Sequence, residues 1–154
     1  MAVVHALVQT GVMPARAGRR AGVDDAELAR AAAFRTELRR FLSRTDAVTA
    51  EAALTPQRYD LLLMVAAAGE LRVTELCELL QLQQTAVTEL VKRTEEAGLI
   101  GRRPSSEDGR VWLLHITAEG ERRLIRAFAA LRDDREALAA VFREVDRRFR
   151  AASA

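Results

Sequence analysis

Two short helical patterns joined by a tight turn, with a hairpin pattern directly after them, constrain the fold of this chain most. Thr74 is the expected N-cap of a helix over 75–80, and Gly98 closes a longer amphipathic helix over 84–97. A polar, glycine-containing tip at 104–109 then separates two strand-like segments, which predicts a β-hairpin. A helix-turn-helix followed by a two-stranded wing is a winged-helix pattern, whose second helix can enter the major groove of DNA.

Helix signals also flank this segment. Thr55 is an expected N-cap, proline follows it at the first position of a helix over 56–68, and Gly69 ends that helix. The stretch 71–73 is too short for a helix and indicates a small strand. Thr117 is the expected N-cap of the helix after the hairpin.

Apolar stripes near both ends of the chain exceed what a thin winged helix can cover. A helix expected from residue 24 carries apolar side chains at i, i+4, i+7 and i+8, and Asp133 and Asp134 open a last helix with a second stripe. Such stripes are what a helical dimer interface would bury, and a helical hairpin within one chain is the alternative. The predicted dimerisation residues are Phe34, Leu38, Phe41, Leu138, Val141, Phe142, Val145 and Phe149.

The predicted fold class is mainly α with a small β-wing, namely a winged helix-turn-helix plus N- and C-terminal dimerisation helices. We divide the chain into a poorly specified N-terminal arm (1–23), an N-terminal dimerisation helix and linker (24–54), the winged helix-turn-helix (55–120) and the C-terminal dimerisation helices (121–154). At 154 residues the chain suits one domain, or two small lobes that share a core.

A series of short motifs resembles a known family in order and spacing. They are LTPQ at 54–57, VTEL at 73–76, TAVT at 85–88, EAGLI at 96–100, RRP at 102–104, DGR at 108–110 and LHITAEG at 114–120. Together they resemble the MarR (multiple antibiotic resistance regulator) family over roughly residues 25–150. The resemblance implies an obligate homodimer, most often a repressor, in which each winged helix binds half of a pseudo-palindromic operator. It also implies release of DNA when a small phenolic or other aromatic acid binds between the dimer helices and the winged helix.

Within this frame, the outward residues of the recognition helix 84–97 are candidates for base and phosphate contacts. Glutamine can bind adenine through two hydrogen bonds, threonine can contact a thymine methyl group or a phosphate, and lysine or arginine can bind guanine or phosphate. A solvated face is the alternative. The candidates are Gln83, Gln84, Thr85, Thr88, Lys92 and Arg93, while Glu89 is expected to pair with Arg93 at i+4. Gln83 is a poor N-cap for this helix.

The wing over 100–116 supplies further candidates. The resemblance places Arg110 near the minor groove with Asp108 orienting it, and a local ion pair that pins the hairpin is the alternative; both can hold at once. Arg102 and Arg103 should point to opposite faces of a strand, so we expect one of them to meet phosphate.

The charge balance limits how this module could bind DNA. The chain has 24 basic and 22 acidic residues, but residues 55–120 carry 7 basic and 10 acidic ones. DNA binding would therefore need the charges to be segregated. We expect Lys92, Arg93, Arg102, Arg103 and Arg110 to face DNA, and Glu70, Glu75, Glu78, Glu95 and Glu96 to face away. A mixture on the DNA-facing side would favour the alternative function, a dimeric protein-interaction module with a weak or silent DNA-binding surface.

Several single residues have both a functional and a structural interpretation. The resemblance makes Phe34, Arg35, Leu38 and Tyr59 candidates for an effector pocket, with ordinary core packing as the alternative. Cys77 is expected to fill the core, and a redox-responsive regulator acting through Cys77 is the alternative. We expect His115 to form a hydrogen bond on the second strand of the hairpin and Trp112 to anchor the base of the wing.

The sequence carries no pattern of catalysis. A glycine-rich phosphate loop, a His-Glu metal motif and a Ser-x-x-Lys pattern are all missing, so we expect neither an enzyme, nor a cofactor, nor a metal site. No run approaches the roughly 18 apolar residues that a membrane span needs, and the first residues lack the basic region of a signal peptide. We therefore predict a cytoplasmic protein without a membrane partner.

Overall fold

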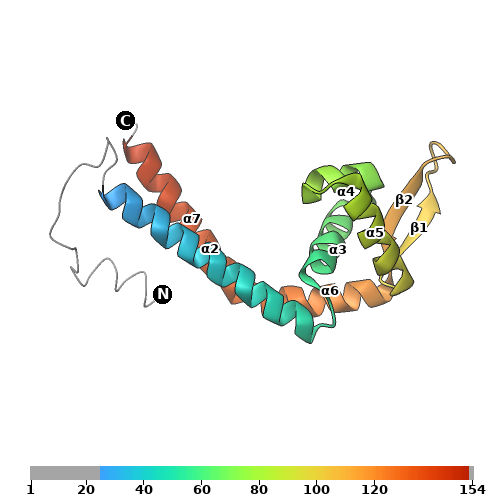
Figure 1. Ribbon diagram of the computed structural model, residues 1–154, viewed down its shortest axis with the longest axis horizontal. Coiled ribbons are helices and arrows are strands. Elements are labelled where there is room, and N and C mark those ends of the chain that lie inside the picture. Colours follow the sequence, from blue (N-terminus) through green and yellow to red (C-terminus); the bar gives the residue numbers. More distant parts are fainter. Residues whose placement is uncertain (1–24, 153–154) are drawn as a thin grey trace. The chain divides into compact units, whose positions relative to one another are not determined.

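The computed structural model describes residues 25–152 and has a two-stranded wing in an otherwise helical chain, which confirms the predicted fold class (Figure 1). The predicted N-terminal arm, 1–23, lies outside the described residues, as do the side chains of Val145 and Phe149. The elements in order are α2 (Asp25–Glu51), α3 (Pro56–Ala68), α4 (Val73–Leu80), α5 (Gln84–Glu96), β1 (Ile100–Pro104), β2 (Trp112–Ile116), α6 (Ala118–Ala130) and α7 (Arg132–Ala152).

Two compact units share the chain. Residues Thr45–Leu131 form one, which we call the winged-helix unit, and α2 up to Arg44 with α7 form the other, which we call the helix pair. The last two turns of α2 and the whole of α6 therefore group with the winged helix. The winged-helix unit is thus longer at both ends than the predicted domain, 55–120.

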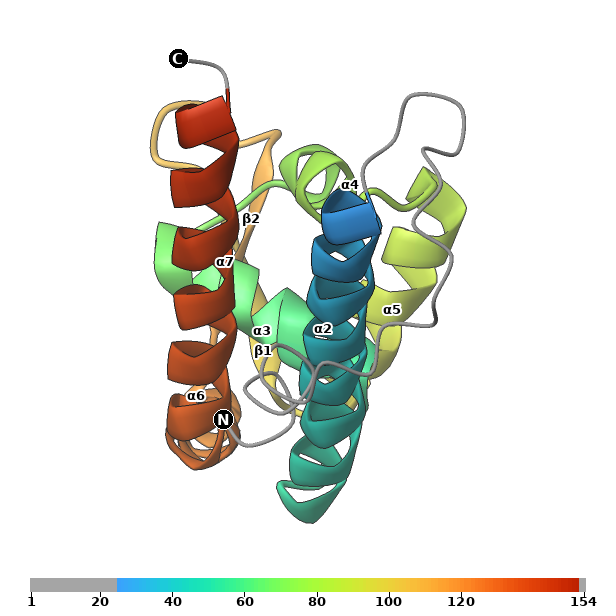
Figure 2. The ribbon, with the colours of Figure 1, turned by 90° about the vertical axis from the view of Figure 1, so that its left-hand side faces the viewer.

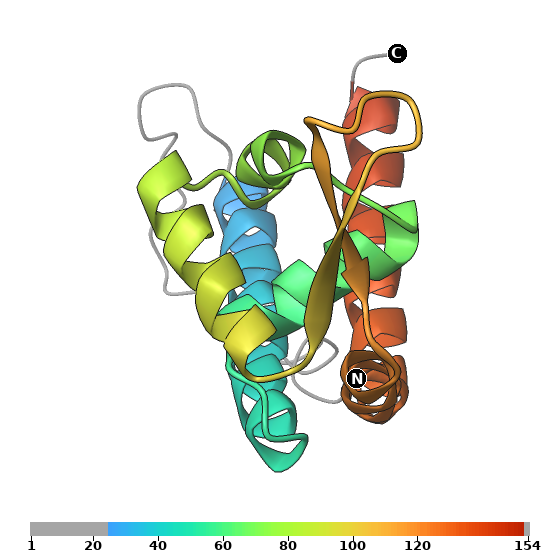
Figure 3. The ribbon, with the colours of Figure 1, turned by 90° about the vertical axis from the view of Figure 1, so that its right-hand side faces the viewer.

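The winged-helix unit is built around α3, which packs against α4, α5, α6 and β2. In Figure 3 the two wing strands cross in front of this helix. Leu61, Leu62 and Val65 of α3 are fully buried, and they meet a core to which the end of α2, α4, α5, the base of the wing and α6 all contribute. Cys77 packs against the same core and is partly buried, as the sequence predicted.

Most helix boundaries follow the predicted local signals. The Thr55 hydroxyl accepts a hydrogen bond from the Arg58 amide at the start of α3, and the Thr117 hydroxyl accepts one from the Gly120 amide at the start of α6. Gly69 ends α3 with φ 78°, a left-handed value that glycine adopts without strain.

The start of α4 differs from the prediction. The helix begins at Val73, so Thr74 is not the N-cap, and of the predicted strand 71–73 only Leu71 pairs, in an isolated bridge with Leu114. Arg72 takes the N-cap position, and its amide donates a 2.7 Å hydrogen bond to the Glu75 carboxylate. A carboxylate in the first turn also interacts favourably with the helix dipole, and these two effects together place the helix start two residues earlier than Thr74 as the N-cap would.

The wing is an antiparallel pair in which Ile100 lies opposite Ile116 and Pro104 lies opposite Trp112. Leu71 extends the pairing at one position, because its amide and carbonyl exchange hydrogen bonds with those of Leu114. Leu114 is fully buried and anchors the base of the wing. The prediction for Trp112 is wrong: the register places it at the far end of the strands, where it is 54% exposed.

The helix pair consists of two helices that run side by side in opposite directions (Figure 2). The Phe34 and Phe142 rings meet edge to face with centroids 5.0 Å apart, and Arg44 forms an ion pair with Asp134 at 3.7 Å. In this pair, none of the apolar side chains that the structure describes is buried, and Leu28, Leu42 and Phe142 are exposed. The helices thus contact each other within one chain and still leave apolar surface uncovered.

Candidate nucleic-acid interface

Helix α5 separates a buried face from an exposed polar face. Val87, Val91 and Thr94 are fully buried, and the Thr94 hydroxyl is satisfied by the Leu90 carbonyl at 2.7 Å. The opposite face exposes every candidate that the sequence named on this helix, namely Gln84, Thr85, Thr88, Lys92 and Arg93, with Gln83 just before them. This face therefore offers amide, hydroxyl and cationic groups together, the groups that bind base edges and phosphates.

The N-terminus of α5 has no side-chain cap. Gln83 occupies the N-cap position in extended geometry, and its side chain makes no capping hydrogen bond, as the sequence predicted. The first amides of a helix are unpaired within the helix and carry its positive dipole end, which attracts anions such as phosphate. The helix thus presents Gln84 and Thr85 together with these amides at one exposed end.

The cations of α5 and β1 are paired with acids. Arg93 binds Glu89 at 2.7 Å, as expected, and Lys92 lies 4.0 Å from Glu96. On β1, Arg102 binds Glu95 of α5 at 2.9 Å.

Arg103 binds Glu70, and this hydrogen bond is the main reason why the pKa of Glu70 is lowered from its ordinary value. The predicted segregation of charge is therefore wrong, because Glu70, Glu95 and Glu96 each lie beside a cation that was expected to face DNA.

At the wing tip, Asp108 shapes the turn and does not hold the guanidinium of Arg110. Its carboxylate accepts a 3.0 Å hydrogen bond from the Arg110 backbone amide, and its carbonyl accepts one from Val111. In the part of the chain that the structure describes, no acidic side chain lies within 4.0 Å of the Arg110 guanidinium, so the local ion pair is not formed. Arg110 is exposed.

His115 lies against the backbone of the facing strand. A Cβ at Gly101 would come within 2.7 Å of the imidazole, so only glycine leaves room for this ring. The buried Nδ1 of His115 has no hydrogen-bond partner in the described structure, so this atom does not make the hydrogen bond that was predicted for His115. Among the described residues, no group of three histidine, cysteine or acidic side chains could hold a metal ion, and no helix is long and apolar enough to cross a membrane.

The effector candidates fall on both units. Phe34, Arg35 and Leu38 lie on α2 in the helix pair, where Phe34 contacts Phe142. Tyr59 lies on α3 and is 5% exposed within the core of the winged-helix unit.

The structure also contains a cavity lined by arginines of α6, which the sequence analysis did not predict. The spacing Arg122-Arg123-x-x-Arg126 on one helix is the sequence signal that could have revealed it.

Comparison with known proteins finds a family that part of the chain resembles. Residues 54–111, which run from the linker before α3 to the start of β2, match the sequence profile of the MarR family. Over this segment the chain is similar to the MarR family. A curated relative from Bacillus subtilis (strain 168), described as an uncharacterized HTH-type transcriptional regulator, YdgJ, is 30% identical over 71 residues. That alignment covers 46% of this chain and 43% of YdgJ, so it spans less than half of the relative.

Solved structures extend the likeness of fold beyond the matched segment. A probable transcriptional regulator from Pseudomonas aeruginosa has 25% identity and a TM-score of 0.56, over 76% of this chain and 93% of that one. A Cys-to-Ser mutant of MarR from E. coli, complexed with operator DNA, has 16% identity and a TM-score of 0.64, over 79% of this chain and 91% of that one. The shared fold thus includes residues outside the segment that matches the family profile.

Proposed function

We propose that this chain is a transcriptional regulator of the MarR family, a repressor that binds a pseudo-palindromic operator as a homodimer. The observation that carries the proposal is the exposed polar face of α5, which begins at an N-terminus without a side-chain cap and is backed by a buried face. Gln83, Gln84, Thr85 and Thr88 approach the bases, and the wing residue Arg110 approaches the backbone or the minor groove. The MarR structure with operator DNA shares this fold and supports the assignment.

The paired charges define how the regulator binds. Lys92 and Arg93 are more than 60% exposed, and exposed ion pairs contribute only about 0–1 kcal/mol, so phosphate can replace their acidic partners at little cost. The acidic side chains nevertheless repel DNA of any sequence. At a sequence other than the operator, no base contacts offset this repulsion. We therefore expect weak non-specific binding and a specificity that depends on a few side chains of α5.

The dimer part of the proposal is supported by the helix pair. Its described apolar side chains are not buried in the single chain, and Leu42 and Phe142 are exposed. A second copy that packs on these helices would cover them and would place two winged helices on one operator. In this arrangement Phe34, Leu38, Phe41, Leu138 and Val141 belong to the dimerisation surface together with Phe142, Val145 and Phe149. As a DNA-binding regulator the protein would act in the cytoplasm.

The test is fluorescence anisotropy of the full chain with duplexes from the region upstream of its own gene and of any divergently transcribed neighbour. We expect one duplex to bind at least about 1,000-fold more tightly than a shuffled duplex. Thr88→Ala should weaken specific binding more than non-specific binding, because base contacts and not phosphate contacts carry sequence information. Thr36→Ala, an exposed threonine of α2, is the matched control. Binding without sequence selectivity at every salt concentration would contradict the proposal. It would favour the alternative function, a protein-interaction module, which the mixed charges of this surface also favour.

Control by a ligand is a separate part of the proposal and rests on the family resemblance. A small phenolic acid would bind near Phe34, Arg35, Leu38 and Tyr59 and release the operator. Salicylate added to the operator complex should lower the anisotropy of wild type more than that of Arg35→Gln. An unchanged signal in both proteins would contradict control by a phenolic ligand.

The redox alternative has a separate test. Peroxide should leave operator binding intact because Cys77 packs against the core. A loss of binding that Cys77→Ser prevents would establish the redox alternative.

A further inference from the structure

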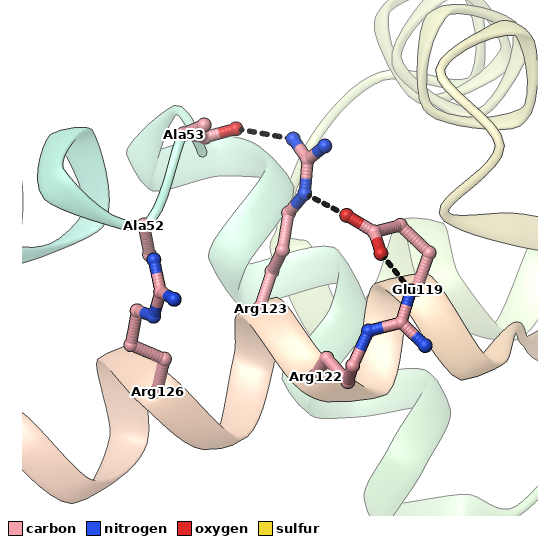
Figure 4. Close-up of a pocket in the computed structure, with 6 residues that line it drawn as sticks. All are labelled: Ala52, Ala53, Glu119, Arg122, Arg123 and Arg126. Atoms are coloured by element: carbon pink, nitrogen blue, oxygen red, sulfur yellow. Dashed lines mark hydrogen bonds and ion pairs between the residues drawn. The ribbon is translucent and has the colours of Figure 1, made fainter.

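A cavity of about 360 Å³ on the winged-helix unit is lined by three arginines and one acid (Figure 4). Arg122, Arg123 and Arg126 and the carboxylate of Glu119 come from α6. The remaining walls are Ala52 and Ala53, in the linker between α2 and α3. All of these residues belong to one compact unit, so the cavity does not depend on the helix pair.

The charges in this cavity are not balanced. Glu119 accepts hydrogen bonds from both Arg123, at 2.7 Å, and Arg122, so one carboxylate serves two guanidinium groups. These bonds lower the pKa of Glu119 from its ordinary value, which keeps it ionised. Among the described residues, no acidic side chain lies within 4.0 Å of Arg126. Three cations therefore face one anion.

The linker fixes one of these cations in place. Nη1 of Arg123 donates a 3.1 Å hydrogen bond to the Ala53 carbonyl, which lies seventy residues away in the chain. Ala53 has φ 55°, a left-handed value that a residue with a side chain rarely adopts, and this turn directs its carbonyl at Arg123 (Figure 4). Figure 4 also shows the Arg126 side chain rising from α6 toward Ala52. The cavity thus offers one held and one unpaired guanidinium.

Repulsion between the cations of this cavity lowers the stability of the chain when no anion is bound. Arg122 and Arg126 are four residues apart on α6, a spacing at which like charges repel. A bound anion would remove that repulsion, and guanidinium groups bind carboxylate and phosphate groups through two parallel hydrogen bonds.

We propose that this cavity binds a small organic or inorganic anion with at least two negative charges, such as a phosphomonoester or a di- or tricarboxylate. Two charges match the excess of two cations over the single carboxylate. Arg126 makes the principal contact, Arg123 contributes its remaining N–H donors, and Arg122 adds the third positive charge. None of the effector candidates Phe34, Arg35, Leu38 and Tyr59 lines this cavity, and its occupation does not require DNA binding.

The test is calorimetric titration of the full chain with citrate, inorganic phosphate and, as the singly charged comparison, acetate. We expect saturable binding of citrate or phosphate and none of acetate, together with a rise in Tm as the anion concentration increases. Citrate alone or phosphate alone would identify the carboxylate or the phosphate source. Arg126→Gln should weaken binding about tenfold, because it removes a charge-assisted contact. Arg143→Gln removes the same charge from an exposed site on α7 and should leave the affinity unchanged.

Glu119→Gln is the decisive variant, because it has an expected effect of the opposite sign. Without the carboxylate, Arg122 and Arg123 become available to the ligand, so anion binding should tighten about threefold to tenfold. A variant that merely perturbed α6 would bind more weakly. Equal losses in Arg126→Gln and Arg143→Gln, weaker binding in Glu119→Gln, or equal binding of acetate would each overturn the proposal. It would also be overturned if Arg126→Gln reduced operator affinity in anion-free buffer, because the cavity would then be a contact for DNA phosphate.

Discussion

The winged-helix unit and the helix pair differ in how they bury apolar side chains. In the described structure every buried apolar residue, from Val48 to Leu131, belongs to the winged-helix unit. The helix pair offers an aromatic contact between Phe34 and Phe142 and one ion pair, while the ring of Phe142 stays 49% exposed. The winged-helix unit therefore has a core of its own, and the described part of the helix pair has none.

The largest expected difference is in the cost of truncating a leucine in each unit. Leu76 in α4 is fully buried, and Leu76→Ala should lower the free energy of unfolding by about 2–5 kcal/mol through lost burial and a cavity. Leu42 in the helix pair is 54% exposed, so Leu42→Ala should cost less than about 1 kcal/mol. Urea denaturation followed by circular dichroism at low protein concentration measures both. Similar losses of unfolding free energy in the two variants would mean that both leucines belong to one common core and that the two units do not differ in burial.

A charge placed on the uncovered face of the helix pair should break the proposed dimer. Phe142→Glu is expected to weaken self-association about thirtyfold or more, because an aromatic residue at the centre of an interface typically contributes about 2 kcal/mol or more. The matched control is Leu79→Glu, which charges an equally exposed apolar side chain on α4 of the winged-helix unit. Size-exclusion chromatography with light scattering should give a monomer for the first variant and a dimer for the second. A dimer in Phe142→Glu and a monomer in Leu79→Glu would place the interface on the winged-helix unit and contradict the proposal.

Freed cations should affect DNA binding in one unit and not in the other. Glu70→Gln removes the partner of Arg103, so the winged helix gains a cation for phosphate. We expect operator and non-specific affinity to rise about equally and the salt dependence to steepen by about one unit of slope. Glu37→Gln similarly frees Arg40 in the helix pair and should change neither quantity. Anisotropy titrations from low to high salt distinguish the outcomes, and an unchanged slope in Glu70→Gln would show that Arg103 does not reach DNA.

The sequence predicted best what depends on neighbouring residues. The caps at Thr55 and Thr117, the glycine end of α3 and the Glu89–Arg93 pair all follow from spacings of three or four residues along one helix, and the structure confirms them. The predicted cap of α4 was wrong because Glu75 accepts a hydrogen bond from the Arg72 amide, and the N-cap lies two residues before Thr74.

The parts that could not be predicted depend on contacts between distant segments. Glu70 reaches Arg103 only because Leu71 pairs with Leu114 of the wing, and the charge segregation failed for that reason. The arginine cavity forms because the carbonyl of Ala53 meets Arg123 across seventy residues of chain. The candidates on α5 could be predicted as exposed, because the buried face of that helix is periodic; their contacts to bases remain a prediction.

The smallest expected effect concerns pH and again separates the units. The pKa of Asp60, in α3 of the winged-helix unit, is raised from 3.8, first by desolvation and second by the carboxylate of Asp46. A raised folded-state pKa means that the folded protein holds the proton more tightly than the unfolded chain. Ionisation therefore costs stability, fully above the raised pKa and not at all below 3.8. Asp60→Asn should raise Tm slightly at pH 7, and the gain should disappear as the pH falls below 3.8.

Asp133→Asn, in the first turn of α7 in the helix pair, is the control for this effect. It removes a carboxylate that interacts favourably with the helix dipole, so it should lower Tm or leave it unchanged at pH 7. Thermal unfolding of both variants between pH 3 and pH 7 measures the contrast. A gain in Tm that persisted at the acid end for Asp60→Asn would mean that amide packing, and not relief of a destabilised charge, accounts for the difference between the two sites.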